Sequence, residues 1–326
     1  CDWKRQRFTM DEVCARAVRH TFFRMFNDEL IYRGKRLVNW DVYLQTSISD
    51  DEVYHENVEG HFWHLHYPVI DPQPGEPDVV VVATTRPETM LGDTAVAVHP
   101  DPETALASRL SRLEVEKEKA SAKDLPGLET EIEELRTRQT QLLPQLIKLR
   151  DMALAGRKIK LPLLDRPLHL ICDAWAKPEL GSGCVKITPA HDPNDYEVWK
   201  RHSATIERIN VLNPDGTLNE NAGPYAGIDR HVARDRIVDD LKAIGLLGDV
   251  EDRQVDIGHS DRSKTPIEPY LSEQWFIRMA DIDGGVLMGR GTPKEHRSPG
   301  LVQAAMDAVE DGRVSIHPER DTKTYL

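Results

Sequence analysis

The segment Val79-Val80-Val81-Val82-Ala83-Thr84-Thr85-Arg86-Pro87-Glu88-Thr89-Met90-Leu91-Gly92-Asp93 joins an apolar run to a polar loop. Its β-branched beginning, Val79 to Val82, predicts a buried strand. The loop that follows carries three threonines, an arginine and carboxylates. Hydroxyls and a guanidinium at a strand end suit the recognition of a small polar group beside a phosphate or ester oxygen. A simple turn between two strands explains the same composition, so this segment alone leaves both interpretations open.

A second segment, a hundred residues later, also runs from a short strand into a polar turn: Gly181-Ser182-Gly183-Cys184-Val185-Lys186-Ile187-Thr188-Pro189-Ala190-His191-Asp192-Pro193-Asn194-Asp195-Tyr196-Glu197. We expect a strand over 184–187 and then a helix through about His202. Asp192 followed by Pro193 is typical of an N-cap with proline at the first helical position. Asp195 lies one turn in, where a carboxylate favours the positive end of a helix. Both carboxylates therefore have a structural explanation beside a catalytic one.

Together these two segments closely resemble the editing domain of the valyl-tRNA synthetases, which are class I aminoacyl-tRNA synthetases. Isoleucyl and leucyl synthetases share the threonine-rich loop and an acidic second segment, but the motif K-I-T-P-A-H-D-P-N-D at 186–195 is the one found in valyl synthetases. Further matches at 32–40, 210–224 and 267–276 extend the resemblance over nearly the whole chain.

The resemblance implies post-transfer editing, the hydrolysis of threonine wrongly esterified to valine tRNA, with the 3′ end of tRNA(Val) carrying threonine as the partner. Threonine is nearly isosteric with valine, so an apolar synthetic pocket rejects it weakly and a second site must hydrolyse the product; this logic comes with the family. The activity belongs to an enzyme that ligates valine to tRNA(Val) using ATP.

The resemblance also implies roles for residues of this chain. Asp195 is expected to anchor the substrate's α-amino group, while Asp192 and Lys186, helped by Thr188, frame the threonine side chain. The opposite wall, which is expected to hold the terminal adenosine, consists of Thr84, Thr85, Arg86 and Thr89. The residues expected to act in catalysis are Asp195, Asp192, Lys186 and Arg86. His191 is expected in the substrate pocket, and its use as a general base is the less favoured hypothesis. A positioned water with oriented donors suffices for an activated ester.

The family's ATP-binding signatures, H-x-G-H and K-M-S-K-S, do not occur in the sequence. We therefore expect a fragment that does not activate valine, with ATP and Mg²⁺ used only by the full-length enzyme. The expected domains are a flanking segment of the synthetase body at 1–57, the editing domain at 58–247, and a return segment at 248–326.

The resemblance implies a mixed α/β fold with a β-barrel-like editing core of short strands and flanking helices. Strands are predicted near 62–67, 79–84, 94–98, 168–173 and 184–188, and helices near 192–202 and 229–245. Residues 1–45 are expected to form helices of the body. Residues 284–300 are rich in glycine and proline, which predicts a mobile loop.

The stretch 104–155 departs from the family. Leu128, Ile132, Leu135, Gln139, Leu142, Leu146 and Leu149 alternate spacings of four and three, which is a heptad pattern. A similar leucine pattern begins upstream, and residues 124–127 between the two carry a turn signal. Together these patterns predict an inserted antiparallel helical hairpin, a coiled coil. Pro144 is expected to kink the second helix or to mark where it ends and restarts. A passive arm and a contact to protein or tRNA both remain open as its role.

The chain also departs from the family at a metal site. Many valyl synthetases carry two C-x-x-C pairs that bind zinc, and here those positions hold Asp41, Leu44, Ser260 and Ser263. The four cysteines of the chain show no C-x-x-C spacing, and Asp41 with His259 would supply only two ligands. We therefore expect no zinc and no metal site.

The composition favours an enzyme fragment of the cytoplasm, with no membrane partner: there is no signal peptide and no apolar run of transmembrane length. A net charge of −13 argues against indiscriminate nucleic-acid binding. Two other hypotheses stay open. One is the editing domain of an isoleucyl- or leucyl-type synthetase, and the other is a non-catalytic module that contacts tRNA or serves assembly.

Overall fold

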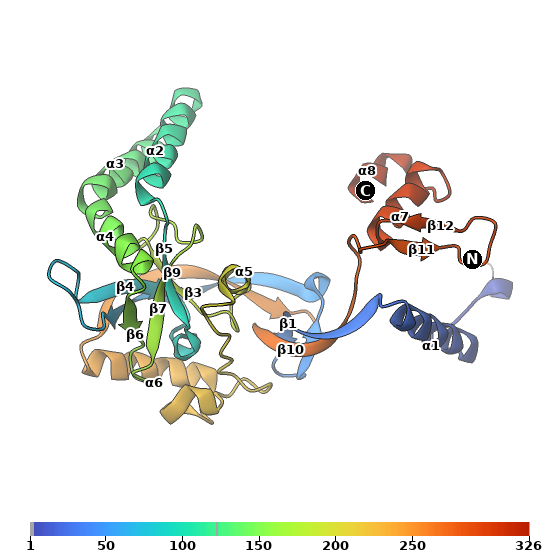
Figure 1. Ribbon diagram of the computed structural model, residues 1–326, viewed down its shortest axis with the longest axis horizontal. Coiled ribbons are helices and arrows are strands. Elements are labelled where there is room, and N and C mark those ends of the chain that lie inside the picture. Colours follow the sequence, from blue (N-terminus) through green and yellow to red (C-terminus); the bar gives the residue numbers. More distant parts are fainter. Residues whose placement is uncertain (1–2, 122, 326) are drawn as a thin grey trace. The chain divides into compact units, whose positions relative to one another are not determined.

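The computed structural model describes residues 3–121 and 123–325, which divide into two units (Figure 1). One unit comprises Leu37–Ser272, and the other comprises Cys1–Arg36 with Glu273–Leu326. The chain passes from one unit to the other within β1 (Ile31–Asp41) and again within β10 (Ile267–Ile277). These strands belong to a three-stranded sheet of order β10-β1-β2, with β2 at Thr46–Ile48.

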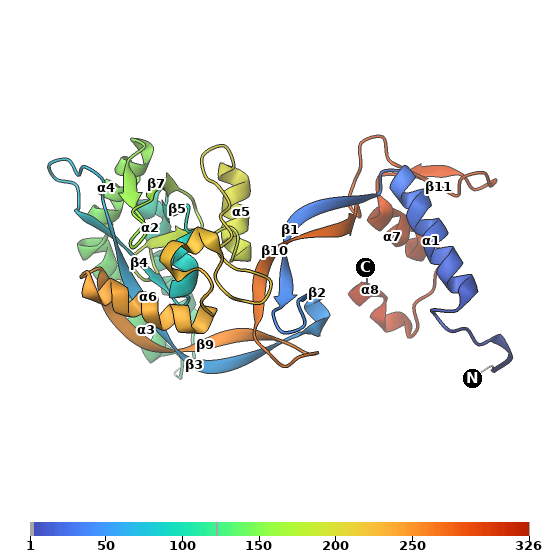
Figure 2. The same cartoon turned by 90° about the horizontal axis from the view of Figure 1, so that it is seen from below.

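Two further sheets form the centre of the larger unit (Figure 2). In the first, the long strand β3 (Val53–Pro68) pairs antiparallel with β4 (Val79–Thr84) on one side and β9 (Leu247–Ser260) on the other. The second has the order β6-β7-β5-β8, formed by Lys158–Lys160, Pro167–Cys172, Ala95–Val98 and Cys184–Ile187. Strand β5 is parallel to β7 and antiparallel to β8.

The period of two in a strand explains how these sheets share one core. Val96 and Val98 point into a cluster that also contains Leu65 and Val82 of the first sheet. Ala95 and Ala97 point to the opposite face, where they pack with Val198 of a helix. Both faces of β5 are therefore buried, and this burial fixes the position of the loop that precedes the strand.

The β-barrel-like core that the resemblance implied is not confirmed. Among the described residues no sheet closes on itself, and a single bridge, Val69 with Ile159, links the first sheet to the second. The Val81 carbonyl of β4 accepts a hydrogen bond from the Ser182 hydroxyl, 2.5 Å away. A side chain in a Gly-Ser-Gly bend thus caps a strand edge that a barrel would pair with another strand.

Two helices flank the sheets: α5 (Pro193–His202) and α6 (Arg230–Ala243). Each begins at an aspartate whose side chain accepts backbone N–H bonds, which confirms the N-cap predicted at Asp192. Short 3-10 helices lie at η2 (Asp50–Glu52), η3 (Pro87–Gly92) and η4 (Glu220–Tyr225). The five predicted strands correspond to β3, β4, β5, β7 and β8, and the two predicted helices correspond to α5 and α6.

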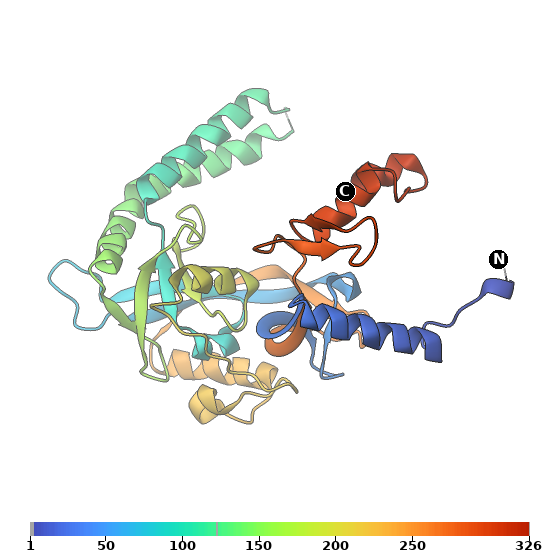
Figure 3. The same cartoon turned by 45° about the vertical axis from the view of Figure 1, so that its right-hand side comes forward.

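Three helices occupy the stretch that departs from the family: α2 (Pro102–Lys119), α3 (Leu125–Gln141) and α4 (Leu143–Leu154). Figure 3 shows α2 and α3 lying side by side. Leu106 and Leu113 of α2 pack with Ile132 and Leu135 of α3, and Lys117 pairs with Glu129 at 2.7 Å. Pro144 lies in the first turn of α4, so the second helix ends and restarts there, one of the two predicted outcomes.

The smaller unit contains η1 (Trp3–Arg5), α1 (Glu12–Asn27), β11 (Val286–Met288), β12 (His296–Ser298), α7 (Leu301–Glu310), η5 (Glu319–Asp321) and α8 (Thr322–Tyr325). Two predictions were wrong here. Residues 31–41 form a strand where helices were expected, and β11 pairs with β12 where 284–300 was expected to be a mobile loop. None of the described helices combines the length and apolar character needed to cross a membrane.

Candidate functional site

A cavity of about 190 Å³ lies between the loop after β4 and the turn that joins β8 to α5. All nine side chains singled out from the sequence line it, together with four others: Thr84, Thr85, Arg86, Thr89, Lys186, Thr188, His191, Asp192 and Asp195, then Phe62, Ala83, Trp175 and Val185. The two sequence segments, a hundred residues apart, are therefore the two walls of one cavity.

The wall after β4 is fixed by its own hydroxyls. The Thr84 hydroxyl accepts a hydrogen bond from the Arg86 N–H at 3.0 Å, and the Thr89 hydroxyl donates to the Arg86 carbonyl at 2.9 Å. Such side-chain bonds to a nearby backbone stabilise tight turns. Behind them, a Cβ at Gly92 would stand 2.8 Å from the Ile209 carbonyl oxygen, so only glycine permits this approach. The turn interpretation and the site interpretation of this loop are thus compatible.

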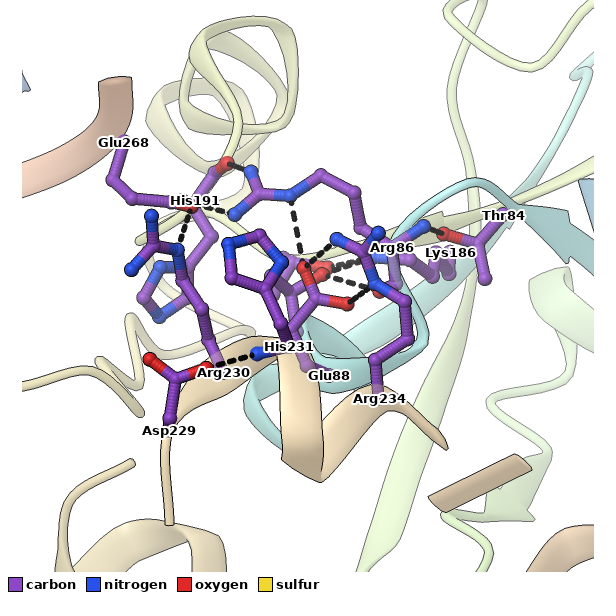
Figure 4. Close-up of polar contacts among 12 residues, drawn as sticks. Thr84, Arg86, Glu88, Lys186, His191, Asp229, Arg230, His231, Arg234 and Glu268 are labelled. Carbon is purple, nitrogen blue, oxygen red and sulfur yellow. Dashed lines mark hydrogen bonds and ion pairs between the residues drawn. The ribbon is translucent and has the colours of Figure 1, made fainter. Parts of the chain in front are cut away.

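Arg86 is held in a network of buried charges (Figure 4). Its Nε lies 3.3 Å from Glu88, a fully buried carboxylate that Arg234 also contacts at 2.8 and 3.0 Å. Although burial raises the pKa of Glu88, the two guanidinium groups bring it below its ordinary value. The Arg86 guanidinium also pairs with Glu268 and donates to the His191 carbonyl at 3.1 Å. Arg86 therefore links the β4 loop to the opposite wall and to β10.

The floor of the cavity holds a buried ion pair. The Lys186 ammonium lies 3.3 Å from Asp93 and 3.4 Å from the Thr89 hydroxyl, and it also donates to the Thr188 hydroxyl. Asp93 is fully buried and accepts a further bond from the Tyr67 hydroxyl at 2.7 Å. The lysine is thus positioned by three oxygen-bearing side chains, and this wall presents a cation and hydroxyls to the cavity.

The carboxylates stand at the start of α5. One oxygen of Asp192 caps the helix by accepting the N–H groups of Asn194 and Asp195, at 2.7 and 3.1 Å. Asp195 accepts the Thr188 N–H at 2.9 Å. Burial raises the pKa of Asp195 to about 7, and the neighbouring Asp192 carboxylate adds to the rise. Among residues 3–121 and 123–325, no Lys, Arg or His forms an ion pair with Asp195. A buried carboxylate without a cation thus faces the cavity.

His191 is almost fully buried, and its Nε2 accepts a hydrogen bond from the Val211 N–H at 2.9 Å. Burial, followed by the charges of Arg86 and Lys186, lowers the pKa of His191 well below its ordinary value. The ring is therefore neutral, with its basic nitrogen already occupied. Its geometry fits the support of the turn better than removal of a proton from water.

Several residues of the site were missed by the sequence analysis. Asp93 and Glu88 lie inside the segment 79–93, and their carboxylates beside the threonine-rich loop could have been predicted to belong to the site. Trp175, Arg234 and Glu268 come from distant parts of the chain. Glu268 lies in the matching stretch 267–276, but nothing in that stretch assigns it to this site. Only the packing of η3 against α6 and β10 brings Arg234 and Glu268 beside Arg86.

The positions that correspond to the family's zinc ligands do not fit zinc. Asp41 and Ser260 are fully buried, and the Asp41 carboxylate accepts the Leu44 N–H at 2.9 Å. The Ser260 hydroxyl accepts N–H bonds from Arg262 and Ser263 at 3.2 and 3.3 Å. Across the described chain, no three His, Cys, Asp or Glu side chains cluster in a way that would hold a metal. A carboxylate, a leucine and two hydroxyls lack the thiolates that zinc prefers.

A second cavity, of about 580 Å³, borders the first. Thr85 and Arg86 line both, and the walls of the larger one come mainly from the β3 and β9 strands with His231 and Arg234 of α6. The two cavities therefore share the Thr85–Arg86 segment as a common wall.

Residues 1–326 match the family described as tRNA synthetases class I (I, L, M and V). The chain belongs to this family, which confirms the resemblance found in the sequence. It is similar to the valine–tRNA ligases of Rhodopirellula baltica (56% identical), Enterococcus faecalis (41%) and Carboxydothermus hydrogenoformans (40%). Each comparison covers 100% of this chain but only 30%, 29% and 29% of the relative. The chain thus spans about three tenths of the length of these relatives.

Proposed function

We propose that residues 58–247 form an editing domain that hydrolyses threonine from mischarged tRNA(Val), within an enzyme that ligates valine to tRNA(Val). The observation that carries this proposal is the Asp195 carboxylate, which lines the small cavity, is buried, and has a pKa raised to about 7. A substrate ammonium would supply the missing cation and lower that pKa. The relatives named as valine–tRNA ligases support the choice of tRNA.

The walls suggest how the ester is held. The α-ammonium lies against Asp195, and the free oxygen of Asp192 faces the same space. The threonine hydroxyl meets the Lys186 ammonium and the Thr188 hydroxyl, which form hydrogen bonds that a valine methyl cannot. An acceptor and donors placed for a hydroxyl discriminate strongly against a methyl group, because they would be left unpaired.

The hydrolysis then requires mainly that a water and the ester carbonyl are correctly oriented. A water attacks the ester carbonyl, the bond to the ribose oxygen breaks, and the ribose hydroxyl leaves with a proton from that water. Thr84, Thr85, Arg86 and Thr89 form the wall opposite the carboxylates. The Arg86 guanidinium already binds Glu88, Glu268 and the His191 carbonyl. We therefore assign Arg86 to holding the wall in place rather than to catalysis of the hydrolysis.

The test replaces Asp195 by alanine in the 326-residue chain and measures hydrolysis of threonyl-tRNA(Val). Loss of one ionic contact to the ammonium is expected to slow hydrolysis roughly 100-fold, with the circular dichroism spectrum unchanged. The control is Glu197→Ala on the same helix, where the carboxylate is exposed and pairs only with Lys200. Full activity of Asp195→Ala would refute the assignment.

Two other functions are separated by the same assay. An isoleucyl- or leucyl-type editing domain would prefer valyl or norvalyl esters on its own tRNA, so the three esters are compared on the matching tRNAs. A binding or assembly module would retain the tRNA without releasing threonine. The lined cavity with its unpaired carboxylate favours catalysis over a passive binding or assembly module.

A further inference from the structure

The loop between β7 and β8, residues 173–183, supplies one wall of the small cavity through Trp175. Its first part is tied to α5, because Asp173 pairs with Arg201 at 2.8 Å and with His202 at 2.9 Å. Asp173 also accepts the Trp175 N–H at 2.8 Å. The tryptophan is therefore fixed on one side to the helix that carries Asp195. At the far end of the loop the Ser182 hydroxyl donates to the Val81 carbonyl of β4, and the backbone between these two points needs another support.

That support comes from the helical arm, by which we mean α2, α3 and α4. Arg138 of α3 donates through Nε to the Pro178 carbonyl at 3.2 Å and through its other end to the Gly181 carbonyl. Among the described residues, no carboxylate forms an ion pair with Arg138. Its guanidinium is thus committed to two backbone carbonyls of this loop, a geometry that the planar fork of arginine suits better than lysine does.

A second contact lies where the loop ends. Leu146 of α4 is fully buried against Gly183, whose φ is +75°. A Cβ on Gly183 would stand 2.7 Å from a Leu146 methyl group. The backbone of the loop therefore lies directly on the arm, and the arm contacts the loop through a polar anchor and an apolar one.

We propose that the helical arm positions the Trp175 wall of the cavity, with Arg138 as the positioning residue. The proposal rests on the editing function proposed above and deepens it. Arg138 does not line the cavity, so it acts through the loop. Its removal weakens the closure of the cavity over the bound ester and leaves the carboxylates, Lys186 and the β4 loop in place. The inserted helices are then part of the active architecture and not a passive arm.

The anchor is tested first by hydrogen exchange, which needs no activity. The Ala176, Leu180 and Gly183 amides are bonded within the loop to carbonyls 2.8 to 3.1 Å away. In Arg138→Ala these amides are expected to exchange about tenfold faster, because the loop loses both hydrogen bonds to α3 and opens more often. The matched control is Arg136→Ala on the same helix, which loses only the exposed pair with Glu114. Unchanged protection in Arg138→Ala would overturn the proposal.

The consequence is tested by hydrolysis of threonyl-tRNA(Val). Arg138→Ala is expected to raise KM about tenfold with kcat within twofold, and Arg138→Lys to recover part of the loss. In Arg138→Ala/Trp175→Ala the two effects are expected not to add, because both act through one wall. Additive effects, or a loss confined to kcat, would refute the positioning role. If the unaltered chain releases no threonine, the editing function fails, whereas the exchange measurement still decides whether Arg138 anchors the loop.

Discussion

Asp195 loses most of its hydration when the chain folds, and the helix that carries it adds a second carboxylate at Asp192. The Lys186 ammonium and the hydrogen bond from the Thr188 N–H offset this cost only in part, because the pKa of Asp195 still rises to about 7. A charge arranged in this way costs stability in the empty site and becomes favourable when a cation binds. Glu88 shows the opposite case, since two arginines neutralise it and its role is structural.

The cost of burying the ionised Asp195 carboxylate predicts that the stability of the folded chain depends on pH. The pKa of Asp195 rises from 3.8 to about 7 on folding, so the folded chain binds the extra proton between these values. Stability from this group is therefore highest below pH 4 and falls as the pH rises to about 7. Asp195→Asn keeps the acceptor for Thr188 and removes the charge. We expect its Tm at pH 8 to exceed that of the unaltered chain by roughly 3 °C or more, with the gain shrinking towards pH 4.

The measurement is thermal unfolding followed by circular dichroism from pH 4 to pH 8. Glu197→Gln provides the comparison, because it removes an exposed carboxylate from the same helix. Its Tm difference is expected to be small at every pH. A Tm difference for Asp195→Asn that does not vary with pH would contradict the assignment of the raised pKa to this side chain.

Among the secondary structure elements, the join between the arm and β8 depends on glycine at one position. Gly183 has a φ of +75° and no room for a Cβ beside Leu146, whereas Gly127 in α3 has open space around the same position. We expect Gly183→Ala to destabilise the chain by about 2 kcal/mol or more, from backbone strain and overpacking. Gly127→Ala is expected to stabilise it by about 0.5 kcal/mol, because alanine favours a helix. Urea unfolding measures both, and equal effects would rule out the close contact.

The sequence predicted best those elements whose side chains follow a clear period. Strands β4 and β5 and helix α5 carry apolar runs or caps that any buried sheet or N-terminus needs. Strand β9 was missed because half of its residues, chiefly polar ones at 249–256, are exposed, so its pairing with β3 rather than burial makes it a strand. The paired β11 and β12 were missed for another reason, because the glycines at 284–291 carry the turn signals of a loop.

For the whole molecule, the lost cysteine pairs predict independence from zinc. Burial alone raises the pKa of Asp41, but the Leu44 N–H and neighbouring serine hydroxyls bring it below its ordinary value. The Leu44 N–H and the nearby serine hydroxyls thus favour the charged form of this carboxylate without a cation. We expect less than about 0.1 zinc per chain by elemental analysis and no change of Tm with EDTA. One zinc per chain, or a Tm lowered by the chelator, would overturn this prediction.

The sequence by itself determined the family, the nine side chains of the small cavity, the strand that begins each wall and the cap at Asp192, because these depend on residue type and on spacing over a few residues. The tertiary structure alone decided that Glu88 lies between Arg86 and Arg234, that Asp93 anchors Lys186, and that Arg138 reaches the Trp175 loop. It also replaced the expected barrel by open sheets. The physical reason is that buried charges and strand edges are satisfied by partners far away in the chain, and no local pattern encodes which partner arrives.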